Sequence, residues 1–225
     1  TTLSERSFAR LIPSTKAPTP PPEARISKLL MVFTACSEAQ GPQLNVKATL
    51  FGRTVRGNTE VEWMTESWQL SASEIAGRID AGETTCVAVT AACIERIEER
   101  EPQVDAWIYL NKSLALENAR VIDRMGSGGL IRGVPLGVKD IIDTFDMPTG
   151  HGSPIHTENR PDYDAPCVAM CRAEGGLVLG KTVTSEFAHL NPGKTKNPHN
   201  PAHSPAGASS GSAAAVADYM VPVAF

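Results

Sequence analysis

The sequence predicts an α/β fold in which helices cover both faces of a sheet. Two short apolar runs, 136–139 and 177–180, are typical of buried strands. Helical patterns precede and follow these runs, and strands that alternate with helices indicate a layered α/β architecture. The composition agrees with this class, because 41% of the 225 residues are hydrophobic and 20% are charged, as in a soluble globular protein.

Two helices are predicted before the first strand. Ser71 and Glu74 have the spacing of a capping box, which starts an amphipathic helix that Gly82 ends. A second helix is predicted over 85–100, because its apolar residues recur on one face. Pro102 is expected to close this helical pair, since proline lacks the backbone N–H that a continuing helix needs.

The remaining elements follow from changes in hydrophobic period and from the positions of glycine and proline. A glycine-rich loop at 126–129 and a long loop rich in Asn and Pro at 191–205 separate them. The predicted elements are, in chain order, a strand at 106–110, a helix at 114–125, a strand at 136–139, a helix at 165–174, a strand at 177–180 and a helix at 213–217.

The first 63 residues differ in character from the rest of the chain. They hold 8 basic and 5 acidic residues, whereas 64–225 holds 13 basic and 20 acidic residues. Five prolines within 13–22 exclude a helix or a central strand there. The apolar run 29–36 is too short to span a bilayer, and it resembles a secretory signal only faintly. We expect 1–63 to be a proline-containing leader, in which 26–63 is a weak hairpin, a disordered tail or residues outside the native frame, and 64–225 to be the folded domain.

Charge and cysteine content exclude several classes of function. The formal net charge of -4 argues against nucleic acid or an anionic membrane as the main partner, because both attract clustered Lys and Arg. The five cysteines are an odd number, form no CxxC pair and have no histidines at zinc-finger spacing. We therefore expect no metal site and a reducing, cytoplasmic location.

The first candidate functional residue is Lys139, at the end of the predicted strand 136–139. Apolar residues precede it, and Asp140 follows it directly. A lysine in apolar surroundings has a lowered pKa because desolvation penalises the ammonium, and the neutral amine can serve as a general base. The competing interpretation is an ordinary surface lysine that closes a strand.

The second candidate feature is a Gly/Ser loop at 204–212 that leads into the small-residue helix. Such a loop presents backbone N–H groups and the positive end of the helix dipole, which suit a phosphate, a carboxylate or an oxyanion. It lacks the lysine of a P-loop and the glycine spacing of a dinucleotide fingerprint, so nucleotide binding at 207–212 is the lesser alternative. Ser210 or Ser212 could equally cap the helix.

Together these features resemble the amidase signature family over about residues 66–225. The motifs that carry the resemblance are Gly133-Val-Pro-Leu-Gly-Val-Lys-Asp140, Gly176-Leu-Val-Leu-Gly-Lys-Thr182 with Ser185-Glu-Phe187, Asn197-Pro-His-Asn-Pro201 and Pro205-Ala-Gly-Ala-Ser-Ser-Gly-Ser-Ala-Ala-Ala215. The resemblance implies an α/β/α sandwich around a mixed sheet, of which 64–225 would be the N-terminal part, truncated on its C-terminal side. It also implies hydrolysis of a carboxamide through a Ser, cis-Ser, Lys triad, without a metal or an organic cofactor.

The resemblance implies roles for individual positions. Lys139 matches the family's catalytic lysine, the general base. A gapless alignment puts Ala208 at the bridging cis-serine, where alanine has no hydroxyl to relay a proton. Ser209 matches the supporting serine that follows, and a deletion of one residue would make it the bridge instead. Val221–Phe225 resembles the start of the strand before the family's nucleophile, so the nucleophilic serine is expected beyond Phe225.

These roles lead to two expectations about function. The first is an amidohydrolase that forms an acyl-enzyme from a small-molecule amide, present here as an incomplete and inactive fragment. The alternative is a non-catalytic, amidase-like subunit or pseudoenzyme that assembles with a complementary chain or with its own copy. A domain cut within its sheet leaves a strand edge without a partner, which favours such an assembly.

Overall fold

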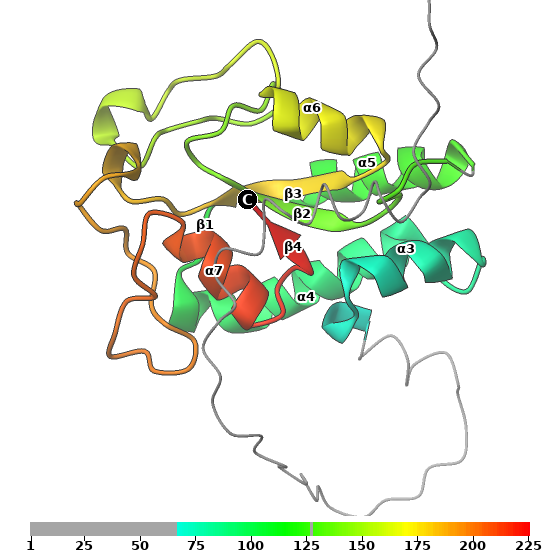
Figure 1. Ribbon diagram of the computed structural model, residues 1–225, viewed down its shortest axis with the longest axis horizontal. Coiled ribbons are helices and arrows are strands. Elements are labelled where there is room, and N and C mark those ends of the chain that lie inside the picture. Colours follow the sequence, from blue (N-terminus) through cyan, green and yellow to red (C-terminus); the bar gives the residue numbers. More distant parts are fainter. Residues whose placement is uncertain (1–66, 127) are drawn as a thin grey trace, which may run out of the picture. The chain divides into compact units, whose positions relative to one another are not determined.

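The computed structural model describes residues 67–126 and 128–225 (Figure 1). The predicted leader 1–63 and the expected start of order at Met64 lie outside the described residues. The strands are β1 (Trp107–Leu110), β2 (Pro135–Lys139), β3 (Leu177–Thr182) and β4 (Val223–Ala224). The α-helices are α3 (Ala72–Asp80), α4 (Cys86–Val104), α5 (Lys112–Arg124), α6 (Pro166–Ala173) and α7 (Ser210–Ala217), and the single 3-10 turns are η2 (Ser67–Gln69), η3 (Pro154–His156) and η4 (Glu186–Ala188).

The four strands form one mixed sheet in the order β1-β3-β2-β4. β2 runs parallel to both of its neighbours, β3 and β4, whereas β1 pairs with β3 in the antiparallel direction. β2 and β3 are buried over nearly their full length, which explains why both are continuous apolar runs rather than alternating patterns. The predicted α/β class, with helices packed on a mixed sheet, is confirmed.

Local sequence signals set where α3 begins. The Ser71 hydroxyl accepts the backbone N–H of Glu74 at 3.3 Å, and the Glu74 carboxylate accepts the backbone N–H of Ser71 at 2.8 Å. This reciprocal pair is the predicted capping box, and it satisfies N–H groups that have no partner within the helix.

α7, in contrast, begins at Ser210 rather than at the predicted 213. Residues 210–212, at the end of the Gly/Ser loop, contact the sheet, and these contacts override the low helix propensity of Gly and Ser.

The prediction that Pro102 ends the second helix is wrong. α4 continues through Pro102, because a proline in the last turn costs mainly the hydrogen bond of its own missing N–H. The helix ends at Asp105, which adopts the left-handed conformation with φ 53°. There the Glu101 carboxylate accepts the backbone N–H groups of Ala106 and Trp107 at 3.0 and 2.9 Å and leads the chain into β1.

Two apolar clusters cover the two faces of the sheet. In Figure 1, α6 lies on one side of β2 and β3, while α4 and α7 lie on the other. The smaller cluster packs α6 against the sheet through Leu136, Val138, Val168 and Val178. The larger cluster joins α3, α4, α5 and α7 to the other face, and its members include Ile75, Val89, Ala119, Leu177, Leu179 and Ala214. Leu177 and Leu179 belong to the larger cluster and Val178 to the smaller one, because successive side chains of a strand point to opposite faces of the sheet.

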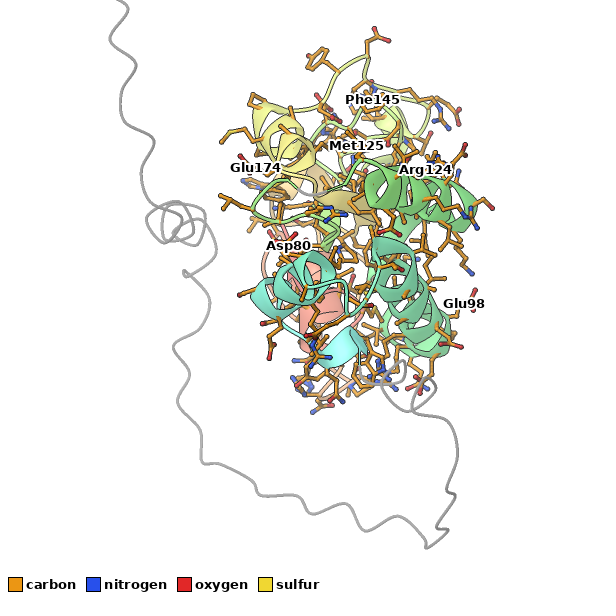
Figure 2. All side chains as sticks on the ribbon, turned by 90° about the vertical axis from the view of Figure 1, so that its right-hand side faces the viewer. Asp80, Glu98, Arg124, Met125, Phe145 and Glu174 are labelled. Atoms are coloured by element: carbon orange, nitrogen blue, oxygen red, sulfur yellow. The ribbon has the colours of Figure 1, made fainter. Side chains whose placement is uncertain are left out.

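α7 is fastened to α4 at its carboxyl end. The side chain of Asp218, which is 9% exposed, accepts from Arg96 at 3.0 Å and from Arg100 at 2.7 Å. The Arg96 guanidinium also lies 4.7 Å from the centre of the Trp68 ring. These contacts fix the helix that follows the Gly/Ser loop, while exposed charges such as Glu98 lie on the outward side of α4 (Figure 2).

Candidate active site

Lys139 is the last residue of β2, at the carboxyl end of the strand, and it pairs in register with Thr182 of β3. Side chains alternate along a strand, so Lys139 shares a face with Gly137 and not with Val138. Val138 packs in the cluster under α6. A Cβ on Gly137 would lie 3.0 Å from the Thr182 methyl and 3.3 Å from Ala224, which packs against the α4 and α7 cluster. Lys139 therefore projects on the face that α7 covers.

The Lys139 ammonium is partly buried, and this burial lowers its pKa below the ordinary lysine value. No hydrogen bond or ion pair joins its side chain to another residue that the structure describes. The adjacent Asp140 is engaged elsewhere, because its carboxylate accepts the Gly150 N–H at 3.1 Å and lies 3.6 Å from the ammonium of Lys181. A partly desolvated amine without a counter-charge is easier to deprotonate than a solvated one.

The Gly/Ser loop turns into α7 beside the end of β3. The Ala208 carbonyl accepts the backbone N–H of Ser185 at 3.1 Å, which ties the loop to the segment after β3. Ser209 is the residue before the first turn of α7, but its hydroxyl caps no backbone N–H. The cis peptide bond that the resemblance implies is not seen, since the peptide bonds described in this loop are trans. The structure thus brings Ala208 and Ser209 to the carboxyl end of β3, beside the strand that ends in Lys139.

Gly211 allows α7 to approach the sheet more closely than a larger residue would. Its N–H donates to the Val183 carbonyl at 3.0 Å. A Cβ at this position would lie 2.3 Å from the Val183 nitrogen and 2.4 Å from the Ala106 carbonyl oxygen. Both are backbone atoms at the ends of the sheet, so they cannot move aside as a flexible side chain would. The small residues of the loop are therefore needed to seat α7 on the strands.

Ser212 joins three segments and does not act as the cap that one interpretation of the sequence predicted. Its hydroxyl donates to the Phe225 carbonyl oxygen. Because a hydroxyl has one proton, the Thr182 hydroxyl is the donor in its 2.7 Å hydrogen bond with Ser212. The pair links α7 to the ends of β3 and β4, at the same edge of the sheet as Lys139.

A cavity of 390 Å³ lies beside the Gly/Ser loop, and Ala208 forms part of its wall. The hydroxyls of Ser185 and Ser210 also belong to this wall; these residues are 3% and 5% exposed, and neither hydroxyl has a hydrogen-bond partner among the described residues. A buried hydroxyl without a partner costs free energy, which makes both oxygens candidates for contact with a bound molecule. The lining residues include no Lys or Arg, which disfavours a phosphate or a nucleotide as the ligand.

Metal-binding and membrane-spanning features were sought in the same part of the chain. Within 67–126 and 128–225, no three His, Cys, Asp or Glu side chains are grouped as metal ligands. His199 and His203 are four residues apart, but they lie in a turn-rich loop and not on a helix. No helix within these ranges is both long enough and apolar enough to cross a bilayer.

Two residues at or near the site lie in the quoted motifs at 176–182 and 185–187, but the sequence alone indicates no role for them. Lys181, the fifth residue of β3, is wholly buried, and Ser185 follows the same strand. The signal that could have found them is topological, because the carboxyl ends of neighbouring parallel strands meet at one edge of a sheet. A functional Lys139 at the end of β2 predicts partners near 181–185, once β2 and β3 are known to be parallel neighbours.

Comparisons with known proteins agree with the resemblance seen in the sequence. The family model described as amidase matches residues 88–225. A glutamyl-tRNA(Gln) amidotransferase subunit from Salinispora tropica is 38% identical over 170 residues, which cover 71% of this chain and 35% of that protein. The corresponding subunit from Thermobifida fusca is 39% identical over 171 residues, or 72% of this chain and 34% of that protein. The chain therefore spans about a third of the length of these curated relatives.

Solved amidase structures share the fold of the described region. Peptide amidase from Stenotrophomonas maltophilia matches with a TM-score of 0.65 and 36% identity, over 69% of this chain and 35% of that one. A structure of fatty acid amide hydrolase matches with a TM-score of 0.66 and 25% identity, over 74% of this chain and 31% of that one. Since the family model covers more than half of its length, the chain belongs to the amidase signature family.

Proposed function

We propose that this chain supplies the proton-accepting part of an amide-hydrolysing site, with Lys139 as the general base. The observation that carries the proposal is the position of Lys139, at the carboxyl end of β2 on the face that α7 covers. Partial burial and the lack of a counter-charge among the described residues favour the neutral amine, which can accept a proton. In this proposal 64–225 is the N-terminal part of the amidase domain, and 1–63 is a leader outside it.

The proposed reaction cleaves a carboxamide C–N bond in two stages. Lys139 accepts a proton from a bridging group, which in turn accepts the proton of a nucleophilic serine. The serine oxygen attacks the carbonyl carbon, backbone N–H groups stabilise the oxyanion, and the amine leaves with a proton returned by the relay. Water then hydrolyses the acyl-enzyme. We place the nucleophile after Phe225 in the sequence of the whole protein, as the resemblance implies.

Ala208 occupies the bridging position of this relay and cannot transfer a proton. Ser209, the next residue, or a water molecule in the space that a serine hydroxyl would fill would have to complete the relay. We therefore expect the chain with Ala208 to turn over more slowly than its Ala208→Ser variant, by roughly the 10²–10⁴-fold that a proton-transfer group contributes.

We further propose that the 390 Å³ cavity beside Ala208 holds the carboxamide of the substrate. Of the two free hydroxyls there, one can donate to the carbonyl oxygen while the other accepts from the NH₂ group. The residues that line this cavity include no Lys, Arg, Asp or Glu, so a small uncharged amide group fits it. Any charged part of a larger substrate would have to be bound outside the cavity.

The test uses the protein as its gene encodes it, including any sequence after Phe225. Ammonia release is measured with acetamide, benzamide, a peptide amide and glutamine. We expect hydrolysis of at least one amide by the Ala208→Ser chain, and its loss when Lys139→Met is added. Ammonia release that persists in the chain with both Ala208→Ser and Lys139→Met contradicts the proposal. So does the absence of ammonia release from every amide in the Ala208→Ser chain.

The role of the cavity is tested in the same background. Ser185→Ala and Ser210→Ala each remove one free hydroxyl and should raise KM about fivefold or more, which corresponds to losing one hydrogen bond of about 1 kcal/mol. Ser204→Ala is the matched control, because Ser204 lines the same cavity but is exposed and its hydroxyl already accepts the Ala206 N–H at 3.0 Å. Equal KM values for all three variants would show that the amide is bound elsewhere.

Ala208 also favours a second candidate function, that of a non-catalytic subunit. Loss of one hydroxyl ends the relay but leaves the cavity and the fold in place. Relatives that are named as subunits of an amidotransferase are, by that name, parts of an assembly. Light scattering and calorimetric titration with an amide separate the candidates. A dimer or larger assembly that binds the amide without releasing ammonia supports the non-catalytic role, and a monomer that hydrolyses amides excludes it.

A further inference from the structure

Lys181 is a charged residue whose side chain is wholly buried, with 0% of its surface exposed. An ammonium in such a place must be compensated by charges and hydrogen-bond acceptors, or its burial is strongly unfavourable. Burial lowers the pKa of Lys181, whereas the nearby carboxylates of Asp140, Asp143 and Asp146 act in the opposite direction. The acceptors that surround the ammonium indicate what the buried lysine does.

Lys181 binds both ends of the turn 142–149. Its ammonium donates to the Ile142 carbonyl at 2.8 Å and to the Pro148 carbonyl at 3.3 Å. It also donates to the Thr149 hydroxyl at 2.6 Å. These three acceptors match the three N–H groups of an ammonium. The buried lysine therefore closes the turn, in the way that a metal ion or a buried water closes other loops.

The clamped turn begins three residues after Lys139. The Lys139 carbonyl accepts the N–H of Ile142 at 2.9 Å, and the Ile142 carbonyl accepts the Lys181 ammonium. The N–H of Asp140 donates to the Thr182 carbonyl at 3.0 Å, and the Asp140 carboxylate lies 3.6 Å from the Lys181 nitrogen. Two hydrogen bonds in series thus connect the Lys181 ammonium to the backbone of Lys139.

The two lysines project from opposite faces of the sheet. Lys181 is in register with Val138, whereas Lys139 is in register with Thr182. The pairing of β2 with β3 shifts between Leu136 and Gly137, so the alternation of side chains in the first half of β3 does not continue unchanged to Lys181. Because its partner Val138 packs under α6, the sheet separates Lys181 from the face that α7 covers. It cannot exchange a proton with groups on that face, and its influence on Lys139 has to pass through the turn.

We propose that Lys181 is a positioning residue, which fixes the orientation and the partial burial of the Lys139 side chain by clamping the turn 142–149. The inference rests on the proposed function, because only that function makes Lys139 the general base. If the clamp is loosened, water reaches the Lys139 amine, and the amine regains the proton affinity of a solvated lysine. If Lys181 serves only the stability of the core, Lys139 is unaffected by such a change.

The turn offers a matched pair of variants. Thr149→Val removes one acceptor of the Lys181 ammonium and keeps nearly the same side-chain shape. Thr144→Val makes the same change in the same turn, at a buried hydroxyl that has no hydrogen-bond partner among the described residues. Lys181→Met removes the clamp altogether.

The readout is the reactivity of Lys139 itself. Trace amounts of an acetylating ester label each lysine in proportion to its neutral fraction, and peptide mass spectrometry compares Lys139 with the exposed Lys196 across a pH series. In Thr149→Val and Lys181→Met, we expect labelling of Lys139 at pH 8 to fall about threefold, which is a rise of about 0.5 in its apparent pKa. In Thr144→Val we expect no change.

The outcomes separate positioning from stability. An unchanged Lys139 profile in a Thr149→Val chain with a native circular dichroism spectrum would overturn the proposal, even if the thermal midpoint falls. Should Lys181→Met fail to fold, Thr149→Val decides alone. The labelling requires no catalysis, so a threefold fall supports the clamp even where no amide is hydrolysed, and the missing hydrolysis then counts against the proposed function only.

Discussion

Alanine substitutions at two helix glycines, Gly77 and Gly211, should have opposite effects on stability. Alanine is favoured over glycine inside a helix by about 1 kcal/mol. Gly77 in α3 is exposed, and a Cβ there would meet no atom within 4 Å. Gly77→Ala should therefore stabilise the fold by about 0.5–1 kcal/mol.

At Gly211 the same change meets the backbone of the sheet. A Cβ would lie 2.3 Å from the Val183 nitrogen, whereas ordinary van der Waals contact begins at 3.4 Å. The first turn of α7 would have to shift by about 1 Å, a displacement that a close-packed interior resists. Overpacking costs about 1–3 kcal/mol, a lost hydrogen bond to the Val183 carbonyl adds about 1, and helix preference returns about 1. We expect a net loss of about 2 kcal/mol.

Urea denaturation followed by circular dichroism measures both effects. For a slope of about 2 kcal/mol/M, Gly211→Ala should lower the midpoint by about 1 M, and Gly77→Ala should raise it by about 0.25–0.5 M. Equal slopes in all three chains would show that only stability has changed. A Gly211→Ala chain as stable as its parent would refute the close seating of α7, and with it the placement of Ala208 and Ser209 beside the end of β3.

Three further changes test the site and its surroundings. Because burial lowers the folded-state pKa of Lys139, the stability of the unsubstituted chain should rise as the pH increases from that lowered value toward the unfolded value of about 10.4. Lys139→Met lacks this slope and should be the more stable chain at pH 7, and urea denaturation over a pH series checks both statements. Asp218→Ala should lower the free energy of unfolding, measured by thermal unfolding, by about 2–3 kcal/mol. The loss is smaller than for a fully buried ion pair because the two arginine partners are 15% and 22% exposed. A loss near zero would mean that α7 is held by packing alone. Burial raises the pKa of Cys86 and Cys93 to about 12, so iodoacetamide should reach the partly exposed Cys167 before either of them, and peptide mapping that finds Cys93 modified earlier would contradict the described core.

The elements that the sequence predicted correctly are those set by neighbouring residues or by burial on both faces. The capping box before α3 depends only on Ser71 and Glu74, and the buried strands β2 and β3 are continuous apolar runs. Pro102 was misjudged because its effect depends on how near the helix end it lies, and that end is set by Glu101 in contact with β1. The early start of α7 likewise depends on a tertiary contact, between Gly211 and the segment after β3.

The features of the candidate site also divide into those that neighbouring residues determine and those that depend on tertiary contacts. The position of Lys139 at the end of a buried strand could be predicted, because the apolar run before it marks β2, and its partial burial agrees with that expectation. The free hydroxyl of Ser185 could not, since its lack of a partner is a property of the whole cavity wall and not of the residues beside it. The same holds for Ser212, whose hydroxyl is taken by Phe225 and Thr182 rather than by its own helix.

The two lysines of adjacent strands differ in the surroundings that their nitrogens meet. Lys181 is more deeply buried than Lys139, and burial lowers its pKa, yet three acceptors and the Asp140 carboxylate surround its nitrogen and favour the protonated form. Lys139 is less buried, but no described residue accepts from it, so only water stabilises its charge, and partial burial removes part of that water. The two lysines therefore differ less in the direction of their pKa shift than in the number of acceptors within hydrogen-bond distance of the nitrogen. A new acceptor placed beside Lys139 should therefore raise the pKa of its amine and lower its labelling by the acetylating ester, even if the fold and the depth of burial stay the same.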